Sequence, residues 1–284
     1  MEDHAGSVTN LSRSSAALAI LSLLPVTLGL AQAPNIELRL VPREIIHQRL
    51  QRFSRGNWAR ETELRKIFDE AGCGPARLYE QTVGAEDPPN VVCLLSGTIG
   101  STIIVGAHSD LGGRGQGVLD NWSGASLLPS LFQTIRDSTP KHTFVFVGFT
   151  REEHHMLGSG FYVKHLSAKQ VGNIRAMVNL DCIGAGSTAV WTHHAEPRLL
   201  STLYEVAQET HSSVRNVDLV LMYDDAMQFR KRRIPTVSFH SLTEDTLRIL
   251  HARQDNLSAI DFSRYYASYC LVATYLARLD SALE

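Results

Sequence analysis

A histidine and a carboxylate follow an apolar segment in the first half of the chain. Residues 102–107 are mostly apolar, as in a buried strand, and His108 and Asp110 come directly after them. Side chains two positions apart on an extended chain share a face, so Asp110 can bind one ring nitrogen of His108 and leave the other for a metal ion. A glycine-rich loop then leads to Asp120, which is either a further ligand or an ordinary N-cap of the next helix.

Two more apolar segments end in acidic residues. Segment 142–149 is followed by Glu152 and Glu153, and segment 174–180 is followed by Asp181. Adjacent carboxylates at a strand end repel each other unless a cation neutralises them. A solvated turn would explain each case alone, but a shared metal site explains all three strand ends together.

The elements that must position these residues alternate between strands and helices. This alternation predicts an α/β fold with a mainly parallel sheet covered on both faces, where ligands bind beyond the carboxyl ends of the strands. No repeat or linker divides the chain after residue 34, which predicts a single domain. The expected strands are 90–95, 102–107, 142–149, 174–181, 189–192 and 235–240, and the expected helices are 43–53, 58–71, 121–136, 159–166, 197–210 and 262–279.

The bulk composition excludes several classes of protein. Of the 284 residues, 44% are hydrophobic and 20% charged, which is typical of a soluble globular chain. The formal charge is −2, from 27 basic and 29 acidic residues, so no strong positive field would attract nucleic acid. The four cysteines lack the spacing of a structural zinc site; Cys73 and Cys93 form a disulfide in an oxidising compartment, or all four are buried thiols.

The first thirty residues have the pattern of a secretory signal peptide. An apolar run over residues 16–30 is followed by small side chains, which favours cleavage after Ala31. The run contains Pro25 and is shorter than the roughly 20 residues that cross a bilayer, so no stable membrane span is expected after cleavage. Residues 1–31 are therefore predicted to be a signal peptide and residues 32–284 the exported domain, periplasmic or extracellular.

The polar motifs occur in a specific order along nearly all of the chain after residue 40. They are Gly106-Ala107-His108-Ser109-Asp110, Asp120-Asn121-Trp122-Ser123-Gly124-Ala125, Glu152-Glu153 with Gly158-Ser159, and Asn179-Leu180-Asp181, followed by Asp225, Phe229, Ile234-Pro235, His251 and Asp255. In this order and spacing the sequence resembles metallopeptidase family 28, which includes secreted leucyl aminopeptidases, glutamate carboxypeptidase and glutaminyl cyclases. The resemblance implies a mixed, mostly parallel sheet between helices, with the site at the strand ends.

The resemblance also implies a set of zinc ligands. Asp120 would bridge two zinc ions, His108 and Asp181 would complete one site, and Glu153 and His251 would complete the other. Imidazole and carboxylate ligands suit zinc, and two ions about 3.5 to 4 Å apart can polarise a peptide carbonyl and activate water.

Further roles follow from the same resemblance. Glu152, next to a ligand but not itself one, would be the general base, and Asp110 would support His108 in catalysis. Asp225 matches a family aspartate, and Tyr223 lies near a tyrosine that contacts the substrate in some relatives, although its offset is imperfect. Both are therefore substrate-binding candidates. The Asp120-Asn121 peptide is expected to be cis.

The sequence departs from the family pattern in the loop after Glu153. Where relatives have a variable residue and then glycine, this chain has His154 and His155. We expect both histidines to lie on the surface or in a pocket wall rather than to bind metal.

The combined interpretation is an exported, zinc-dependent aminopeptidase that acts on peptides. The alternative is a glutaminyl cyclase on the same fold, which uses one zinc ion. A non-catalytic binding module is a third possibility, against which the retained ligands and Glu152 argue.

Overall fold

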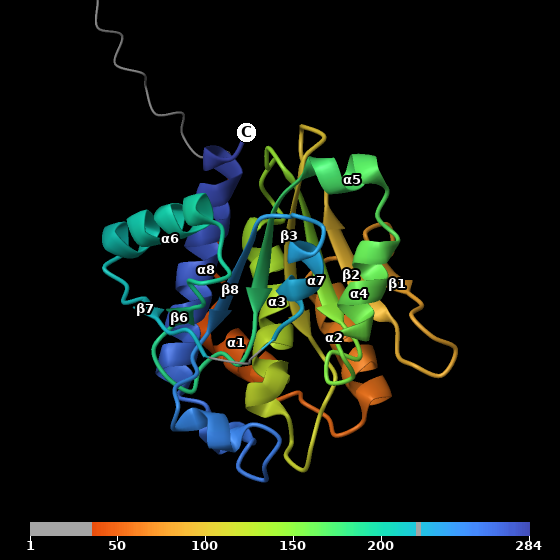
Figure 1. Cartoon of the computed structure of the whole chain (residues 1–284), viewed down its shortest axis with the longest axis vertical. Coiled ribbons are helices and arrows are strands. Elements are labelled where there is room, and N and C mark those ends of the chain that lie inside the picture. Colours follow the sequence, from red (N-terminus) through yellow and green to blue (C-terminus); the bar gives the residue numbers. More distant parts are fainter. Residues whose placement is uncertain (1–35, 220–222) are drawn as a thin grey trace, which may run out of the picture. The chain divides into compact units, whose positions relative to one another are not determined.

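A mixed sheet forms the centre of the protein in the computed structural model, which describes residues 36–219 and 223–284 (Figure 1). In the described residues the sheet has eight strands in the order β1-β2-β4-β3-β5-β8-β6-β7. The strands are β1 (Leu78–Gln81), β2 (Asn90–Leu95), β3 (Thr102–His108), β4 (Thr143–Phe149), β5 (Ile174–Leu180), β6 (Ala189–Val190), β7 (Arg215–Asn216) and β8 (Thr236–His240).

The centre of the sheet is parallel. Strand β3 pairs in parallel with β4 and β5, and β5 pairs in parallel with β8. Antiparallel pairs lie toward the edges, between β1 and β2, β2 and β4, and β6 and β8. The carboxyl ends of the four central strands therefore meet at one rim of the sheet. The predicted α/β fold with a mixed sheet is confirmed.

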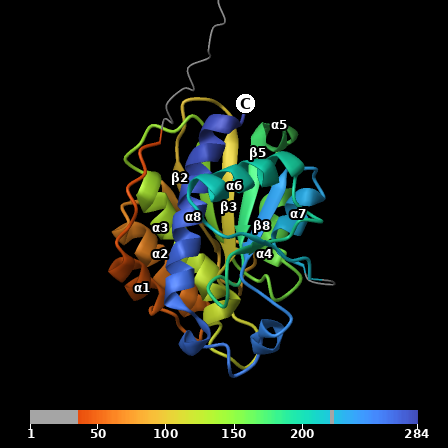
Figure 2. The ribbon, with the colours of Figure 1, turned by 90° about the vertical axis from the view of Figure 1, so that its left-hand side faces the viewer.

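Helices cover both faces of the sheet (Figure 2). Helices α1, α2, α3 and α8 pack on one face through the larger apolar cluster, and α4 and α7 pack on the other face through a second cluster. The helices are α1 (Arg43–Leu50), α2 (Asn57–Glu70), α3 (Ser123–Ile135), α4 (Leu157–Lys164), α5 (Ala168–Asn173), α6 (Pro197–Glu209), α7 (Ala226–Arg230) and α8 (Phe262–Ala282).

The structure adds short elements that the sequence did not predict. These are β1, β7, α5 and α7. The helix expected from residue 121 is also different: a five-residue π-helical turn, η1 (Val118–Trp122), precedes α3, which begins at Ser123. Strand β5 ends at Leu180, so Asp181 and Cys182 follow the strand rather than lie in it.

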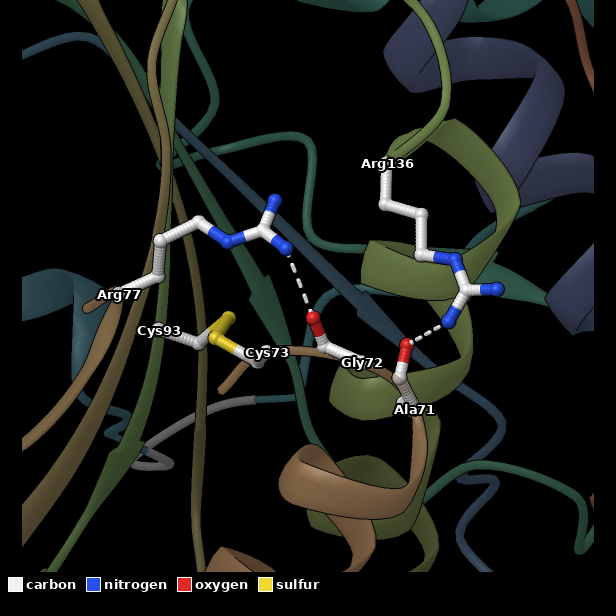
Figure 3. The surroundings of a disulfide bond; sticks show 6 residues. All are labelled: Ala71, Gly72, Cys73, Arg77, Cys93 and Arg136. Atoms are coloured by element: carbon white, nitrogen blue, oxygen red, sulfur yellow. Dashed lines mark hydrogen bonds between the residues drawn. A yellow bond between two sulfur atoms is a disulfide. The ribbon is translucent and has the colours of Figure 1, made fainter. Parts of the chain in front are cut away.

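A disulfide joins Cys73, just after α2, to Cys93 in β2 (Figure 3). Arginines hold the turn on either side of it: Arg77 donates to the carbonyl of Gly72 at 2.8 Å, and Arg136 donates to the carbonyl of Ala71. The bridge fixes the end of α2 against the sheet. Cys182 and Cys270 are free thiols.

The described residues include no helix that is long and apolar enough to cross a membrane. The expected signal peptide and its cleavage site lie outside the described residues.

Candidate metal centre

Three neighbouring parallel strands deliver polar side chains to the same rim. His108 is the last residue of β3 and is paired with Phe149 at the end of β4. The chain beyond each strand is held in place, because Ser109 N donates to Phe149 O at 2.8 Å and Asp181 N donates to Phe239 O at 2.9 Å. The acids that follow β4 and β5 are therefore brought beside His108.

Asp120 reaches this rim from an irregular turn. Its φ and ψ are −112° and 93°, which are not helical, and its peptide bond to Asn121 is cis, as the sequence predicted. Asp255 holds the turn by accepting from Leu119 N at 2.7 Å and Asp120 N at 3.3 Å. The Asn121 side chain donates to Leu180 O at 2.8 Å, which ties the turn to the end of β5. Asp120 is therefore not an N-cap of α3.

One half of the site surrounds His108. Its Nε2 lies 3.2 Å from Asp120 Oδ1 and 3.7 Å from Asp181 Oδ1. Its Nδ1 lies 3.4 Å from Asp110 Oδ1 on the opposite side of the ring. Asp110 thus directs Nε2 toward the two carboxylates.

The other half surrounds His251, which has a φ of 59°. Its Nε2 lies 2.8 Å from Glu153 Oε2 and 3.2 Å from Asp120 Oδ2. Asp120 therefore turns one oxygen toward His108 and the other toward His251. All five predicted ligands are brought together in two groups that share Asp120.

The charges of this cluster fit a cation. Ligand atoms of His108, Asp120 and Glu153 lie within 4.8 Å of one another, as do those of Asp120, Asp181 and Cys182. Burial raises the pKa of Asp181, and the neighbouring Asp120 raises it further. Glu153 Oε1 is buried with no hydrogen-bond partner among the described residues. Crowded carboxylates and an unsatisfied buried oxygen are stabilised by bound metal ions, so the donor set fits zinc.

The carboxylates of the cluster also raise the pKa of the two histidines. Burial lowers the pKa of His108, but the surrounding carboxylates of Glu152, Asp110 and Asp120 outweigh burial and raise that pKa well above its usual value. Hydrogen bonds to Asp120 and Glu153 raise the pKa of His251 to about 10. Each imidazole is therefore held in a strongly negative environment, which favours cations.

Glu152 lies beside this cluster but outside both ligand groups. Its Oε2 is 4.0 Å from His108 Nε2. Burial, together with the charges of Asp225 and Asp181, raises the pKa of Glu152 to about 9. Its position beside both ligand groups suits a group that accepts and returns a proton.

The two residues predicted to bind substrate have different surroundings. Asp225 is buried, and neither of its carboxylate oxygens has a hydrogen-bond partner among the described residues. Burial raises its pKa to about 8, and Asp110 and Asp181 contribute in the same direction. Asp225 therefore belongs to the acidic surroundings of the site. Tyr223 is 55% exposed and makes no hydrogen bond within the described part of the chain.

His154 and His155 are both exposed. His155 has a φ of 64°, so it adopts the left-handed backbone that the glycine of relatives would adopt without strain.

A buried arginine lies next to the site and was not predicted. Arg60 in α2 is fully buried and donates to the backbone carbonyls of Ser109, Gln116 and Gly117. Burial lowers its pKa to about 10, and the nearby carboxylates of Asp110 and Asp255 oppose that shift. The guanidinium therefore stays charged at neutral pH, offsets the acids and fixes both ends of the glycine-rich loop. Its carbonyl partners are placed by the fold, so no local pattern could have revealed this role.

Cys182 lies beside the site, and its Sγ belongs to one of the groups of ligand atoms. Sγ lies 3.2 Å from Asp181 Oδ1. Burial raises the pKa of the thiol well above its usual value, and the charges of Asp120 and Asp181 add to this effect. A protonated Cys182 donates to Asp181 and helps to orient that carboxylate.

The sequence of this chain matches a known protein family. The model of peptidase family M28 matches residues 90–276, a segment that contains all five predicted ligands. The chain belongs to peptidase family M28.

The individual relatives of this chain have low sequence identity to it. A probable leucine aminopeptidase of Trichophyton verrucosum is 25% identical over 248 residues, which cover 80% of this chain and 66% of that protein. A probable leucine aminopeptidase 2 of Aspergillus oryzae is 31% identical over 116 residues, which cover 41% of this chain and 21% of that protein. This M28 chain thus covers less than two thirds of the length of either relative.

Solved structures show the same fold. BSAP, a zinc aminopeptidase from Bacillus subtilis, has a TM-score of 0.62 at 22% identity, with 69% of this chain and 50% of that chain covered. The glutaminyl cyclase of an Acidobacteriales bacterium has a TM-score of 0.71 at 17% identity, with 84% of this chain and 93% of that chain covered. The M28 fold therefore accommodates both chemistries, and the choice between them depends on the site.

Proposed function

We propose that this M28 protein is a zinc-dependent aminopeptidase that removes N-terminal residues from peptides. The observation that carries the proposal is the orientation of Asp120, whose Oδ1 lies 3.2 Å from His108 Nε2 and whose Oδ2 lies 3.2 Å from His251 Nε2. A carboxylate with one oxygen in each of two ligand groups is suited to two metal ions. The names of the fungal relatives and of the Bacillus structure support the same activity.

The ligand groups would hold zinc through His108, Asp120 and Asp181 on one side and through Asp120, Glu153 and His251 on the other. Bound zinc supplies a Lewis acid, which polarises the substrate carbonyl and makes water easier to deprotonate. Asp110 keeps the ring of His108 oriented, and Asp255 keeps the Asp120 turn in place by accepting two backbone N–H groups.

Glu152 would transfer a proton from the attacking water to the leaving amine. Its carboxylate accepts the proton of the attacking water, and the resulting carboxylic acid returns that proton to the leaving amine when the peptide bond breaks. The Oε2 atom is 4.0 Å from His108 Nε2, close enough to face a reacting group held between the two ligand groups. The amine would leave as the remaining peptide, and the N-terminal residue would carry the new carboxylate.

A glutaminyl cyclase is the second candidate, because the structural match to such an enzyme covers most of both chains. In that reaction the attacking amine belongs to the substrate itself, so a single Lewis acid suffices and no water is consumed. Hydrolysis needs water to be bound, deprotonated and aimed, which is a use for the second ligand group. The orientation of Asp120 therefore favours the peptidase.

The proposed location is outside the cytoplasm. The Cys73–Cys93 disulfide supports it, because such bridges form and persist in oxidising compartments. The apolar run near the N-terminus, with its expected cleavage after Ala31, supports the same location.

Metal analysis combined with product analysis tests the proposal. The zinc-loaded protein should contain close to two zinc ions and should release leucine from leucyl peptides. His108→Ala should lower the metal content toward one ion and strongly reduce hydrolysis, whereas His154→Ala, an exposed histidine beside Glu153, should change neither. Conversion of N-terminal glutamine to pyroglutamate by a one-zinc protein, without release of any amino acid, would show that the cyclase is correct instead.

A further inference from the structure

Three arginines line a cavity next to the His251 segment. The cavity has a volume of about 760 Å³, and its lining contains no acidic side chain. The lining residues are Arg55, Arg114, Gly115, Gln116, Arg253, Asn256 and Leu257. The cavity therefore has a local charge of three positive units in a chain whose formal net charge is −2.

The walls come from the same segments that build the metal centre. Arg114 N donates to His251 O at 3.0 Å, and Gln116 N donates to Asp255 O at 2.6 Å. A Cβ on Gly115 would clash with the backbone oxygen of Ala252 and would lie 2.9 Å from that of Asp255, so the two segments pack closely there. These contacts fix the backbone of Arg114 and of Arg253 relative to the metal centre.

Among the described residues, no acidic side chain pairs with the three guanidinium groups. Within residues 36–219 and 223–284, the side chains of Arg55, Arg114 and Arg253 form no ion pair and donate no hydrogen bond. All three are exposed. Like charges gathered around one cavity repel one another, and an anion bound between them would relieve that repulsion. Guanidinium groups also match the planar geometry of a carboxylate.

The cavity adjoins the segment that carries His251. Arg253 is two residues beyond the predicted ligand His251, and Arg114 belongs to the loop that bonds to His251. An extended peptide advances about 3.3 to 3.6 Å per residue, so the two to four residues after the cleaved bond span roughly 7 to 14 Å.

We propose that this arginine cavity binds a carboxylate of the peptide substrate on the leaving-group side of the cleaved bond. The carboxylate is either the C-terminus of a short peptide or an acidic side chain two to four residues from the N-terminus. The inference rests on the proposed peptidase function and adds to it a preference for short or acidic peptides. An exposed ion pair changes affinity by up to about five-fold, so several arginines together give about ten-fold.

Matched peptides test this preference. The zinc-loaded protein is assayed for kcat/KM on Leu-Ala-Ala with a free C-terminus, on the same tripeptide as its C-terminal amide, and on amidated Leu-Ala-Glu. The free acid should be cleaved about ten-fold more efficiently than the neutral amide, and this ratio should fall as the salt concentration rises. A ratio above one for amidated Leu-Ala-Glu over amidated Leu-Ala-Ala assigns the preference to acidic side chains as well as to the terminus.

Variants connect the preference to the cavity. Arg114→Gln and Arg253→Gln should each lower the acid-to-amide ratio by about two- to five-fold. Arg215→Gln, which removes the same charge from the edge strand β7, should leave the ratio unchanged. A ratio near one in the wild-type protein, or a ratio insensitive to Arg114 and Arg253, would overturn this inference while leucine release continues. Failure to release leucine from any peptide would instead overturn the proposed peptidase together with the inference.

Discussion

Asp110 accepts a hydrogen bond from the backbone N–H of Glu152 through Oδ1 at 3.0 Å. The same oxygen lies 3.4 Å from His108 Nδ1, and Oδ2 accepts from Glu153 N at 3.2 Å. One buried carboxylate therefore positions a proposed metal ligand, the proposed general base and a second ligand. The sequence predicted the contact with His108 but not the contacts with the two glutamates, which come from the neighbouring strand.

Asp110→Asn should impair the site without unfolding the protein. The amide keeps one acceptor oxygen, but its NH₂ group would oppose a backbone N–H of Glu152 or Glu153. Changes to residues that orient metal ligands typically cost about 10- to 100-fold in metal affinity or activity. We expect kcat/KM for leucyl peptides and zinc affinity to fall within that range while the thermal midpoint of the zinc-free protein changes little. Asp137→Asn, an exposed carboxylate in the loop after α3, is the matched control, and equal kinetics in both variants would contradict the positioning role.

Glu152 and Glu153 should behave differently although they are adjacent. Glu152→Gln should retain two zinc ions and lose activity by about 100- to 10,000-fold, because proton transfer at this position is removed. Glu153→Gln should weaken binding of one zinc ion, because its Oε2 lies 2.8 Å from His251 Nε2 in the second ligand group. Metal content after dialysis and kcat measured at saturating zinc separate the two effects. Identical metal content and identical residual rates would refute this division of roles.

His155→Gly should stabilise the protein. His155 has a φ of 64°, and a non-glycine residue in the left-handed region costs about 1 to 2 kcal/mol. Glycine removes that cost but loses more backbone entropy on folding, so the net gain should be about 1 kcal/mol or less. Urea unfolding of the zinc-free protein measures the gain, and His154→Gly at the neighbouring exposed position should give none. A decrease in stability for His155→Gly would show that the histidine side chain contributes contacts that outweigh the strain.

His240 should make the protein less stable in mild acid. Its Nε2 lies 3.1 Å from Val217 O and its Nδ1 accepts from Leu242 N at 3.1 Å, which requires the neutral ring. Burial lowers the pKa of His240 from 6.5 to about 4, with Arg215 also lowering it and Asp218 opposing. The unfolded chain binds the proton first, so this stabilisation is full above pH 6.5 and is lost as the pH falls from 6.5 to about 4. Its size is about 3 kcal/mol at most.

The comparison of pH profiles isolates this contribution. The free energy of urea unfolding is measured between pH 4 and 7.5 for the wild-type protein and for His240→Gln, whose side-chain amide can donate to Val217 O without titrating. The decline below pH 6.5 should be smaller in the variant. Parallel profiles would show that other groups cause the acid sensitivity.

The sequence predicted elements that have a strong apolar pattern. Strand β2 was predicted with its observed bounds, and β3 extends only one residue further, to His108, because both are buried runs with clear ends. Strand β7 has only two exposed residues, so no periodic pattern could indicate it. Helix α7 contains only five residues and derives its position from the burial of Ala226 and Phe229 against the sheet.

The same distinction applies to the site. The five proposed ligands could be brought together from the sequence because strand ends and motif order locate them. The roles of Arg60 and Asp255 could not be predicted, because both residues bind backbone groups of distant segments that meet only in the folded chain. The left-handed backbone at His155 could be suspected only from the glycine in relatives.

The family-matched segment does not correspond to a self-sufficient structural module. The match begins at residue 90, yet Arg60 supplies its guanidinium to the loop that contains Gly117, and Asn57 accepts from Leu111 N at 2.9 Å. Cys73, also outside the match, provides half of the disulfide that anchors β2. A recombinant fragment that starts at residue 90 would lack Arg60, so the buried carbonyls and acids would lose their guanidinium partner. It would also lack α1 and α2, which cover an apolar face of the sheet. Domain boundaries for expression, fusion or transplantation of this M28 chain should therefore be set before α1, at the N-terminal side of residue 36.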